Sequence, residues 1–328
     1  MPKPFLVIND RVYGREPIYS PVITALIKSA PLKRLEKISQ FGVPDEFYHL
    51  KNITRLEHSL GVMILLKRLG ASEEEQIAGL IHDVSHTAFS HVIDWVIGDG
   101  GEEDHQDNAH ANFVAKSEIP KILKKFGYDA DKIGDLRSYR LLDREKPHLC
   151  ADRIDYALRE FGEKTVRYTL KHLKVVEGRI VFDDVRAANQ FASAYLKKQM
   201  EHWGGYEAAS RYRMLGNILK LALDNKIIKF SDFWRDDEYI IKKLKSSKNK
   251  KILSALKELR NKSLKDFPKS REIAHKKFRY VDPEVLVDRS IKRLSMLDKE
   301  FAEKIKKTKI INGRGVYLPV SKSLTINS

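Results

Sequence analysis

The sequence lacks the features that mark secreted and membrane proteins. Among its 328 residues there is one cysteine, Cys150, which excludes a disulfide framework and a cysteine-rich zinc site. The first residues show no charged leader followed by an apolar stretch, so no signal peptide is expected. No apolar run approaches the roughly 18 residues that a membrane helix requires. We therefore expect a cytoplasmic protein of a reducing compartment, with no membrane partner.

Internal repeats, proline-rich linkers and low-complexity tracts are also missing. The chain is 42% hydrophobic and 32% charged, which is typical of a globular protein, and its length lies near the upper limit of one domain. A soft boundary is expected near residues 225–240. It would separate a main domain, 1–225 with a core of about 50–165, from a basic helical region, 226–328, packed on that domain.

Most segments have helical periodicity. Ile77, Leu80, Ile81 and Val84 follow the spacing of one helix face, which places residues 77–84 on a helix. The helix before it is expected to end at Gly70, and Ser72 with Glu75 has the spacing of a capping box. The pattern predicts further helices at 108–125, 148–162, 184–202, 206–224 and 251–263.

Strand signals are few. FLVI (5–8) and RIVF (179–182) are the best, and a hairpin is expected within residues 12–19. KKLKSSKNKK (242–251) is expected to be an exposed loop. Residues 284–328 would form either a basic tail or a last hairpin around Asn312-Gly313. The predicted fold class is thus mainly α-helical, a helical bundle with a few short peripheral strands and a helical C-terminal extension.

Positive charge is in excess, and it is unevenly spread. The formal net charge is +16, and residues 242–279 hold 15 Lys or Arg against 3 Asp or Glu. One interpretation is a solvated helical surface, as in thermophilic proteins. The other is a surface for a phosphate-rich ligand, either a nucleotide or a single-stranded nucleic acid. Composition alone leaves both interpretations open.

Histidine and aspartate gather in AGLIHDVSHTAFSH, residues 78–91. His82 and Asp83 are neighbours on the predicted helix, and His58 lies on the apolar face of the helix before it. A single histidine there is best explained as a core residue. A buried carboxylate without a partner is costly, however, and a metal cation supplies one. The three residues together therefore favour a metal site.

A fourth ligand is expected from CADRIDYALREFG, residues 150–162. Asp152 and Asp155 are three positions apart, so they share a helix face. The alternative is an exposed acidic face paired with Arg153 and Arg159, and it suits Asp155 better than Asp152. Two His and two Asp ligands suit a six-coordinate Mn, Fe, Ni or Mg ion better than a structural zinc. Open positions on such an ion imply Lewis-acid chemistry.

These residues belong to an ordered series of motifs: VINDRVYG (7–14), LKRLEKISQFG (32–42), TRLEHSLGVM (54–63), AGLIHDVSHTAFSH (78–91), DHQDNAHANF (104–113) and CADRIDYALRE (150–160). The series resembles the HD superfamily of metal-dependent phosphohydrolases, in the branch of the SAM-and-HD-domain dNTP triphosphohydrolase and the bacterial dGTPases. MLGNILKLAL (214–223) and AHKKFRYVD (274–282) look like the C-terminal helices of that branch. Two departures are Ser85 for a usual Gly and Ala88 for a usual Pro.

The resemblance implies a role for each matching residue. His110 matches no part of the pattern and is equally well explained as a helix-surface residue, and Glu160 stands where the branch carries an acidic residue. The implied roles are metal ligand for His58, His82, Asp83 and Asp152; catalysis or phosphate contact for His86, His91 and His105; and substrate binding for Gln40, Arg55, Arg153 and Tyr156.

The resemblance also implies an activity. It is the hydrolysis of a dNTP to deoxynucleoside and triphosphate with a divalent metal ion, in which His105 or His91 protonates the leaving 5′-oxygen. The implied partners are a nucleotide substrate, a nucleotide effector and further copies of the chain. Two rivals stay open: a phosphodiesterase or nucleotidase acting on cyclic nucleotides, monophosphates or single-stranded nucleic acid, and a non-catalytic nucleotide-binding protein.

Overall fold

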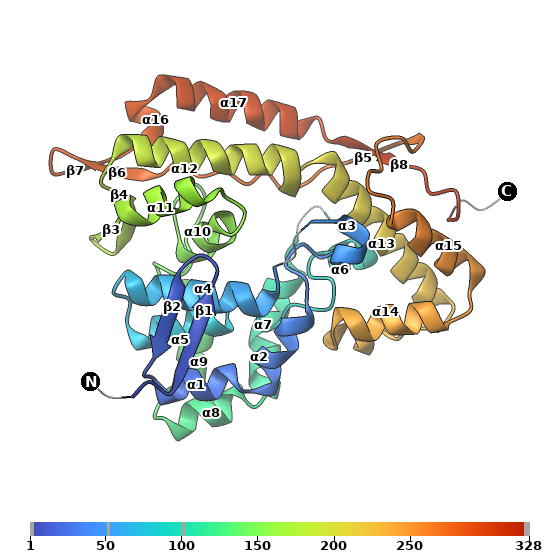
Figure 1. The fold of residues 1–328 in the computed structure, drawn as a ribbon, viewed down its shortest axis with the longest axis horizontal. Coiled ribbons are helices and arrows are strands. Elements are labelled where there is room, and N and C mark those ends of the chain that lie inside the picture. Colours follow the sequence, from blue (N-terminus) through green and yellow to red (C-terminus); the bar gives the residue numbers. More distant parts are fainter. Residues whose placement is uncertain (1–2, 51–52, 99, 101–102, 325–328) are drawn as a thin grey trace.

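The computed structural model describes residues 3–50, 53–98, 100 and 103–324, and it is mainly α-helical as predicted (Figure 1). The longer helices are α4 (Arg55–Arg68), α5 (Glu73–Ile81), α7 (His105–Lys116), α10 (Ala151–Leu158), α11 (Glu163–His172), α12 (Val185–Lys198), α13 (Tyr206–Asp224), α14 (Asp237–Ser246), α15 (Lys250–Leu259) and α17 (Lys299–Gly313). The shorter ones are α1 (Pro21–Ile27), α2 (Ala30–Arg34), α3 (Asp45–Tyr48), α6 (Val92–Ile97), α8 (Ile119–Lys125), α9 (Ala130–Gly134), α16 (Leu294–Leu297) and η1 to η4 (Leu35–Lys37, Leu136–Ser138, Gln199–Trp203 and Phe230–Trp234).

The strands are short and form three small sheets. β1 (Leu6–Asp10) pairs with β2 (Gly14–Ile18), and β5 (Lys269–Ala274) pairs with β8 (Val316–Pro319), both antiparallel. The third sheet has the order β3-β4-β6-β7. Its strands are β3 (Leu173–Val176), β4 (Arg179–Phe182), β6 (Glu284–Val287) and β7 (Ser290–Arg293). The predicted strand 179–182 is confirmed as β4.

The helix boundaries that frame the later site were well marked in the sequence. Thr54 caps α4 by accepting from the Glu57 amide, and Gly70, with φ of +78°, follows the end of that helix. Ser72 caps α5 by accepting from the Glu75 amide. The expected capping box is only half made, because the Glu75 carboxylate accepts from the amides of Leu141 and Leu142 instead.

Four local predictions were wrong. The N-terminal hairpin pairs residues 6–10 with residues 14–18, so its turn lies at residues 11–13. Residues 12–19 therefore do not contain both strands of a hairpin, as expected, but only the second strand. Residues 242–251 are mostly helix, with only 247–249 between α14 and α15, because their apolar positions are buried. Asn312-Gly313 closes α17 and is not a hairpin turn. The motif 274–282 is not helical; Ala274 ends β5, and the rest of the motif is neither helix nor strand.

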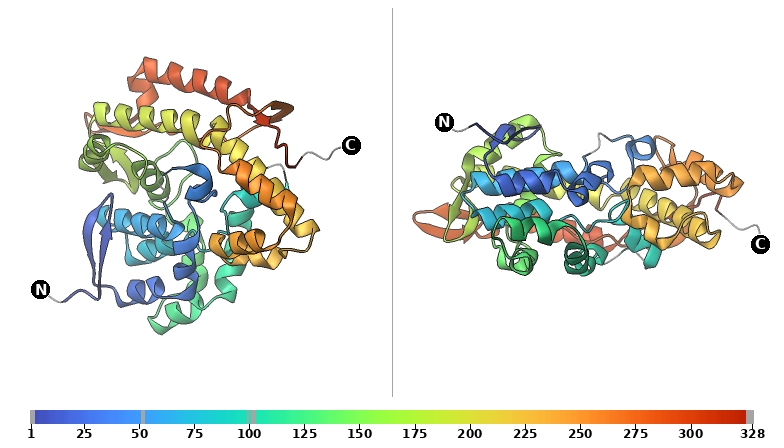
Figure 2. Two further views of the ribbon diagram at one scale, coloured as in Figure 1. Left: turned by 45° about the vertical axis from the view of Figure 1, so that its right-hand side comes forward. Right: turned by 90° about the horizontal axis from the view of Figure 1, so that it is seen from below.

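Two apolar clusters form the core. The first joins α4, α5, α10 and α12, and it takes in Val285 of β6 and Phe301 of α17. The second joins α6, α13, α14 and α15. The chain after residue 225 thus contributes to both clusters, and Figure 2 shows α17 lying along α12 at one edge of the molecule.

None of the helices in the described part of the chain is long and apolar enough to cross a membrane.

Candidate active site

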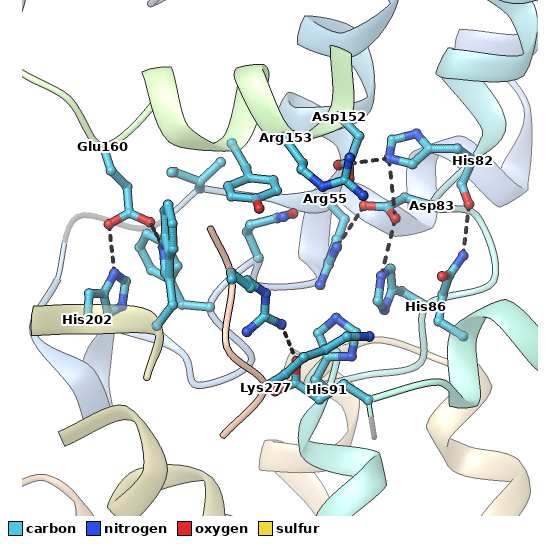
Figure 3. A pocket seen from close by; sticks show the side chains of 18 of the residues that line it. Arg55, His82, Asp83, His86, His91, Asp152, Arg153, Glu160, His202 and Lys277 are labelled. Carbon is cyan, nitrogen blue, oxygen red and sulfur yellow. Dashed lines mark hydrogen bonds and ion pairs between the residues drawn. The ribbon is translucent and has the colours of Figure 1, made fainter. Parts of the chain in front are cut away.

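Three segments bring the predicted metal ligands together. His58 lies on α4, and Asp152 lies in the first turn of α10. Helix α5 ends at Ile81, so His82 is its C-cap residue and Asp83 lies in the following turn, and not on a helix as expected. The turn lets His82 and Asp83 both point toward Asp152 (Figure 3).

The four side chains lie within ion-coordinating reach of one another. His58 Nε2 is 3.0 Å from Asp152 Oδ1 and 3.8 Å from Asp83 Oδ2. His82 Nε2 is 3.4 Å from Asp83 Oδ1 and 3.7 Å from Asp152 Oδ1. His58, His82 and Asp83 are buried, whereas the Asp152 side chain is 30% exposed. The four side chains therefore form a buried cluster that solvent reaches at Asp152.

The donor atoms of this cluster fit a divalent metal ion. His82 Nδ1 donates to the Gly79 carbonyl at 2.7 Å, which leaves the Nε2 lone pair facing the cluster, buried and without a hydrogen-bond partner. His58 Nδ1 donates to Asp155 Oδ2 at 2.7 Å, which turns its Nε2 inward to within 3.0 Å of Asp152 Oδ1. Outer partners of this kind fix the tautomer of metal-binding histidines.

The pKa values of the cluster residues indicate which of them are charged. Burial alone would lower the pKa of His58, but hydrogen bonds to Asp152 and Asp155 outweigh it and raise the pKa to about 9. Burial would raise the pKa of Asp83, yet His82 and Arg55 hold it well below its usual range. The carboxylates are thus ionised, and the point between the ligands favours a cation.

A second group of potential ligands, Asp143, Cys150 and Asp152, lies next to this cluster. Burial raises the pKa of the Cys150 thiol, which keeps it protonated and unsuited to metal binding. Asp143 is exposed and pairs with Arg153. His58, His82, Asp83 and Asp152 are the better metal set.

Asp155 is fully buried, so the interpretation of it as part of an exposed acidic face is wrong. Its carboxylate accepts from His58 and from Arg159, and Arg159 also pairs with Asp10 and Glu57. Asp155 thus holds the His58 ring in place, and its i+3 spacing from Asp152 was the available signal.

Arg55 is buried against the cluster. It donates to Asp83 Oδ2 at 2.7 Å and to Ser90 Oγ at 2.9 Å. It lines the pocket, but its contacts orient Asp83 and the turn that carries His91.

The three predicted catalytic histidines have different surroundings. His86 Nε2 lies 3.2 Å from Asp83 Oδ1, and the His86 and His91 rings meet edge to face at 5.0 Å. His91 Nδ1 is 3.4 Å from Asp94 Oδ2. His105, in contrast, lies outside the pocket lining and packs near Phe230 and Trp234.

The interpretation of His110 as a helix-surface residue is wrong, because the residue is buried. Its Nδ1 lies 3.3 Å from Ser85 Oγ, at the position where the family pattern has Gly. Burial lowers the pKa of His110 to about 4, so the ring is neutral.

The turn between His86 and His91 is held from outside the cluster. Phe89 and Ser90 both have positive φ, 62° and 46°, which is uncommon for residues with side chains. The buried Asp237 carboxylate accepts from the amides of Phe89 at 2.7 Å and of Ser39 at 2.9 Å. Arg34 donates to the Val84 and His86 carbonyls. These ties come from residues that the sequence did not single out.

A pocket of about 320 Å³ extends from the metal set. Its lining contains Gln40, Arg153 and Tyr156, as the resemblance implies. Tyr156 Oη contacts Tyr195 Oη, and Gln40 Oε1 is buried without a hydrogen-bond partner. Small-molecule sites have volumes of this order.

The end of the pocket away from the metal set is built around Glu160 (Figure 3). Glu160 accepts from His202 Nδ1 at 2.7 Å and from Trp203 Nε1 at 2.6 Å. Phe41 and Tyr48 meet the His202 ring edge to face at 4.7 and 5.5 Å. This aromatic end joins residues from far apart in the chain, and His202 and Trp203 carried no motif that could have identified them.

Lys276, Lys277 and Arg279 also line the pocket. They lie on the extended segment that follows β5. The sequence showed their motif but predicted a helix for it, so their place in the pocket was missed.

Comparison with known proteins shows relatives along most of the chain. The family model of the HD domain matches residues 55–176. YdhJ of Bacillus subtilis is 39% identical over 290 residues, which are 86% of this chain and 89% of that protein. The metal-dependent phosphohydrolase cns2 of Cordyceps militaris is 30% identical over 294 residues, 85% of each chain.

A more distant similarity concerns the HD core. The human deoxynucleoside triphosphate triphosphohydrolase SAMHD1 is 34% identical over 103 residues, which are 27% of this chain and 16% of that protein.

Crystal structures show the same fold. A hypothetical protein from Aquifex aeolicus superposes with a TM-score of 0.66 at 21% identity, covering 90% of this chain and 93% of that chain. A phosphohydrolase from Bacteroides thetaiotaomicron gives 0.60 at 18% identity, covering 89% and 94%.

The HD model matches residues 55–176, and the metal-dependent phosphohydrolase cns2 is 30% identical over 85% of each chain. The chain belongs to the HD-domain family of metal-dependent phosphohydrolases.

Proposed function

We propose that the protein hydrolyses a deoxynucleoside triphosphate to deoxynucleoside and triphosphate. The observation that carries the proposal is one continuous pocket. It has a metal-ligand set at one end, an aromatic end around Glu160 and His202, and cationic side chains on the walls between them. Such a pocket suits a ligand with a phosphate at one end and a flat ring at the other. The similarity to SAMHD1 in the HD core supports it.

The metal would be held by His58, His82, Asp83 and Asp152. A Mn, Fe, Ni or Mg ion bound there would supply a Lewis acid for a phosphoryl oxygen and for water. Arg55 and Asp155 keep two of these ligands in place. Arg153, on the turn of α10 that carries Asp152, would neutralise phosphate charge, because phosphoryl transfer depends mainly on positioning and charge stabilisation.

His91 is the better candidate for protonating the leaving 5′-oxygen. It lines the pocket, its side chain is 21% exposed, and Asp94 lies beside its Nδ1. His105 lies outside the pocket and is not assigned this role. His86, between Asp83 and His91, would contact the same phosphate.

The sugar would lie between the metal and the aromatic end. The unpartnered Gln40 Oε1 can accept a hydrogen bond from a sugar hydroxyl, since a buried acceptor without a partner is costly. Tyr156 faces the same part of the pocket. The base would then reach Phe41, Tyr48 and His202.

A nucleotidase or phosphodiesterase acting on a monophosphate, a cyclic nucleotide or single-stranded nucleic acid is the second candidate. The relative cns2, named only as a metal-dependent phosphohydrolase, matches the chain over a far longer stretch than SAMHD1 does. For a nucleic acid, the basic residues 242–279 would be the surface; Lys243, Lys245 and Arg260 of this segment already pair with acidic side chains. A nucleotide effector and a homo-oligomer also remain proposals.

A product assay tests the proposal. The protein is incubated with each dNTP and Mn²⁺ or Mg²⁺, with and without a second nucleotide as activator, and products are separated by ion exchange. Asp83→Asn is the inactive variant, and Asp266→Asn, at an exposed residue, is the matched control. Deoxynucleoside with intact triphosphate, absent only in Asp83→Asn, is expected. Turnover of monophosphates, cyclic nucleotides or oligonucleotides alone would replace this proposal with the second candidate.

A further inference from the structure

The turn that carries His82 and Asp83 is held by a side chain from another helix. Helix α5 ends at Ile81, so the carbonyls of its last turn and of the next residues have no partner within the helix. His82 Nδ1 donates to the Gly79 carbonyl, and the carbonyl of His82 itself accepts from Gln106 Nε2 at 2.8 Å. Gln106 lies in the first turn of α7, so this contact ties the turn to a second helix.

Ser85 holds the Gln106 side chain in place. The second N–H of the Gln106 amide donates to Ser85 Oγ at 3.0 Å, and Ser85 Oγ donates to the Gln106 backbone carbonyl at 3.2 Å. Ser85 is fully buried, and a buried polar group that loses its hydrogen bond is costly. Gln106 therefore cannot turn away from the His82 carbonyl without also leaving Ser85.

His110 completes this group one turn further along α7. It is buried, and its Nδ1 lies 3.3 Å from Ser85 Oγ. A serine hydroxyl has one proton, which Ser85 gives to the Gln106 carbonyl, so the His110 ring donates from Nδ1. Ser85 Oγ then accepts two hydrogen bonds and donates one, which uses its full capacity.

Neither Ser85 nor His110 belongs to the pattern that carries the family resemblance. Ser85 stands where that pattern has Gly, and His110 matches no part of it. A glycine has no side-chain oxygen, so at position 85 it could make none of the three contacts. The two departures contact each other in the folded chain, and they are best explained as one feature.

We infer that Ser85 and His110 are positioning residues for the metal site, and that they act through Gln106. Together they hold the His82 carbonyl. They thereby fix the directions in which the His82 and Asp83 side chains point toward the ion. The inference rests on the metal set of the proposed function and does not depend on the identity of the substrate.

Metal binding measured without substrate tests the inference. Electron paramagnetic resonance would distinguish free from bound Mn²⁺ during titration of the full chain. Co²⁺ would then take the place of Mn²⁺, because its visible absorption spectrum reports the ligand geometry. The unfolding temperature of each metal-free variant would be measured alongside.

The variants separate the three contacts. Ser85→Ala removes all of them, His110→Leu removes one, and His110→Asn keeps a side-chain N–H that can donate to Ser85. The double variant Ser85→Ala with His110→Leu tests whether the two residues act together. Ser29→Ala is the matched control, because Ser29 is a buried serine outside the pocket lining that donates to the Leu26 carbonyl.

Ser85→Ala is expected to weaken Mn²⁺ binding about 10-fold and to shift the Co²⁺ bands. This is the lower end of the range for residues that support a metal ligand, because Arg34 still holds two other carbonyls of the turn. His110→Leu should weaken binding about 3- to 5-fold, the effect of one hydrogen bond, and His110→Asn should restore most of the affinity. The double variant should bind Mn²⁺ as Ser85→Ala does. Ser29→Ala should match the wild type.

Unchanged Mn²⁺ affinity and Co²⁺ bands in Ser85→Ala, with a lowered unfolding temperature, would overturn the inference, because the group would then only stabilise the fold. Additive losses in the double variant would contradict it too. If Ser85→Ala does not fold, Ser85→Gly, which restores the family residue, gives the same test.

The outcomes also separate this inference from the proposed function. If dNTP turnover is absent but the metal-binding pattern holds, the proposed reaction fails and the positioning role stands. If turnover is present without the pattern, only the positioning role fails. If the wild type binds no Mn²⁺, the metal set fails, and both proposals fail with it.

Discussion

The two ends of the pocket are built in different ways. The metal end, with the proposed ligands His58, His82, Asp83 and Asp152, lies inside the range that the HD model matches, and His58 and His82 are each held by a hydrogen bond on the side away from the cluster. At the opposite end, Phe41, Tyr48, His202 and Trp203 surround Glu160, and one wall comes from residues 276–279; of these residues, Glu160 alone lies inside that range. The difference indicates that the residues proposed for the reaction lie in short sequence motifs. The residues that would contact the rest of the substrate lie far apart in the sequence and come together only in the folded chain. Variants at the two ends should therefore have separable effects.

Removal of a metal ligand should have the largest effect. His82→Ala deletes an inward-facing Nε2 and a single hydrogen bond to the Gly79 carbonyl, so the fold should survive. We expect kcat to fall by about 10³-fold or more, as for residues that act as a unit. Steady-state kinetics, with circular dichroism to check folding, measures this. A fall of less than about 10-fold would show that His82 does not hold the catalytic ion.

Loss of the support behind His58 should have a smaller effect. Asp155→Asn weakens the hold on His58 Nδ1, and such changes typically cost about 10- to 100-fold in metal affinity or activity. Activity measured against Mn²⁺ concentration should show a shifted midpoint with kcat largely recovered at saturation. Unchanged metal dependence would mean that Asp155 only stabilises the fold through Arg159.

The aromatic end should affect substrate binding alone. His202→Ala removes the ring that Phe41 and Tyr48 contact edge to face. Stacking of a base on an aromatic side chain is worth about 1–3 kcal/mol, so loss of the ring should raise KM about 10-fold while metal content stays constant. If metal binding fell along with KM, the two ends would not be independent.

The buried Asp237 side chain, which holds the His86–His91 turn, should make the free energy of unfolding depend on pH. Burial raises the pKa of Asp237 to about 7 although two backbone amides donate to it. The folded chain thus holds this proton more tightly than the unfolded chain, whose carboxyl titrates near pH 4. The stability from this group is present below about pH 4 and is lost as the pH rises to about 7.

Asp237→Asn removes that titration. The variant should unfold at a lower temperature, since an amide cannot accept both hydrogen bonds through oxygen, and its Tm should fall less than that of the wild type between pH 5 and pH 8. Scanning calorimetry at the two pH values checks this. A larger fall in the variant would mean that the carboxylate is stabilised in the fold.

Much of the fold and of the metal end could be predicted because the signals are local. Helix periodicity, the cap at Ser72 and the stop at Gly70 act over one or two turns. His58, His82 and Asp83 stood out because buried histidine and aspartate need a partner. Even here the end of α5 at Ile81 was missed, since periodicity alone continued to Val84.

The remaining features depend on long-range packing. Lysines around 242–251 indicated a loop, but Ile241, Leu244 and Ile252 are buried in the second cluster and keep the segment helical. Residues 275–283 leave the helix pattern because Gln199, Asn312 and Pro147 take their backbone hydrogen bonds. No spacing within the sequence shows that Lys277 reaches the same pocket as Arg153.

The most direct test of the account is the position of the metal. Crystals grown with Mn²⁺ would be measured for anomalous scattering. We expect one strong peak per chain, about 2.0–2.4 Å from His58 Nε2, His82 Nε2 and one oxygen each of Asp83 and Asp152. A peak at Asp143, Cys150 and Asp152, or none between the four side chains, would contradict the account.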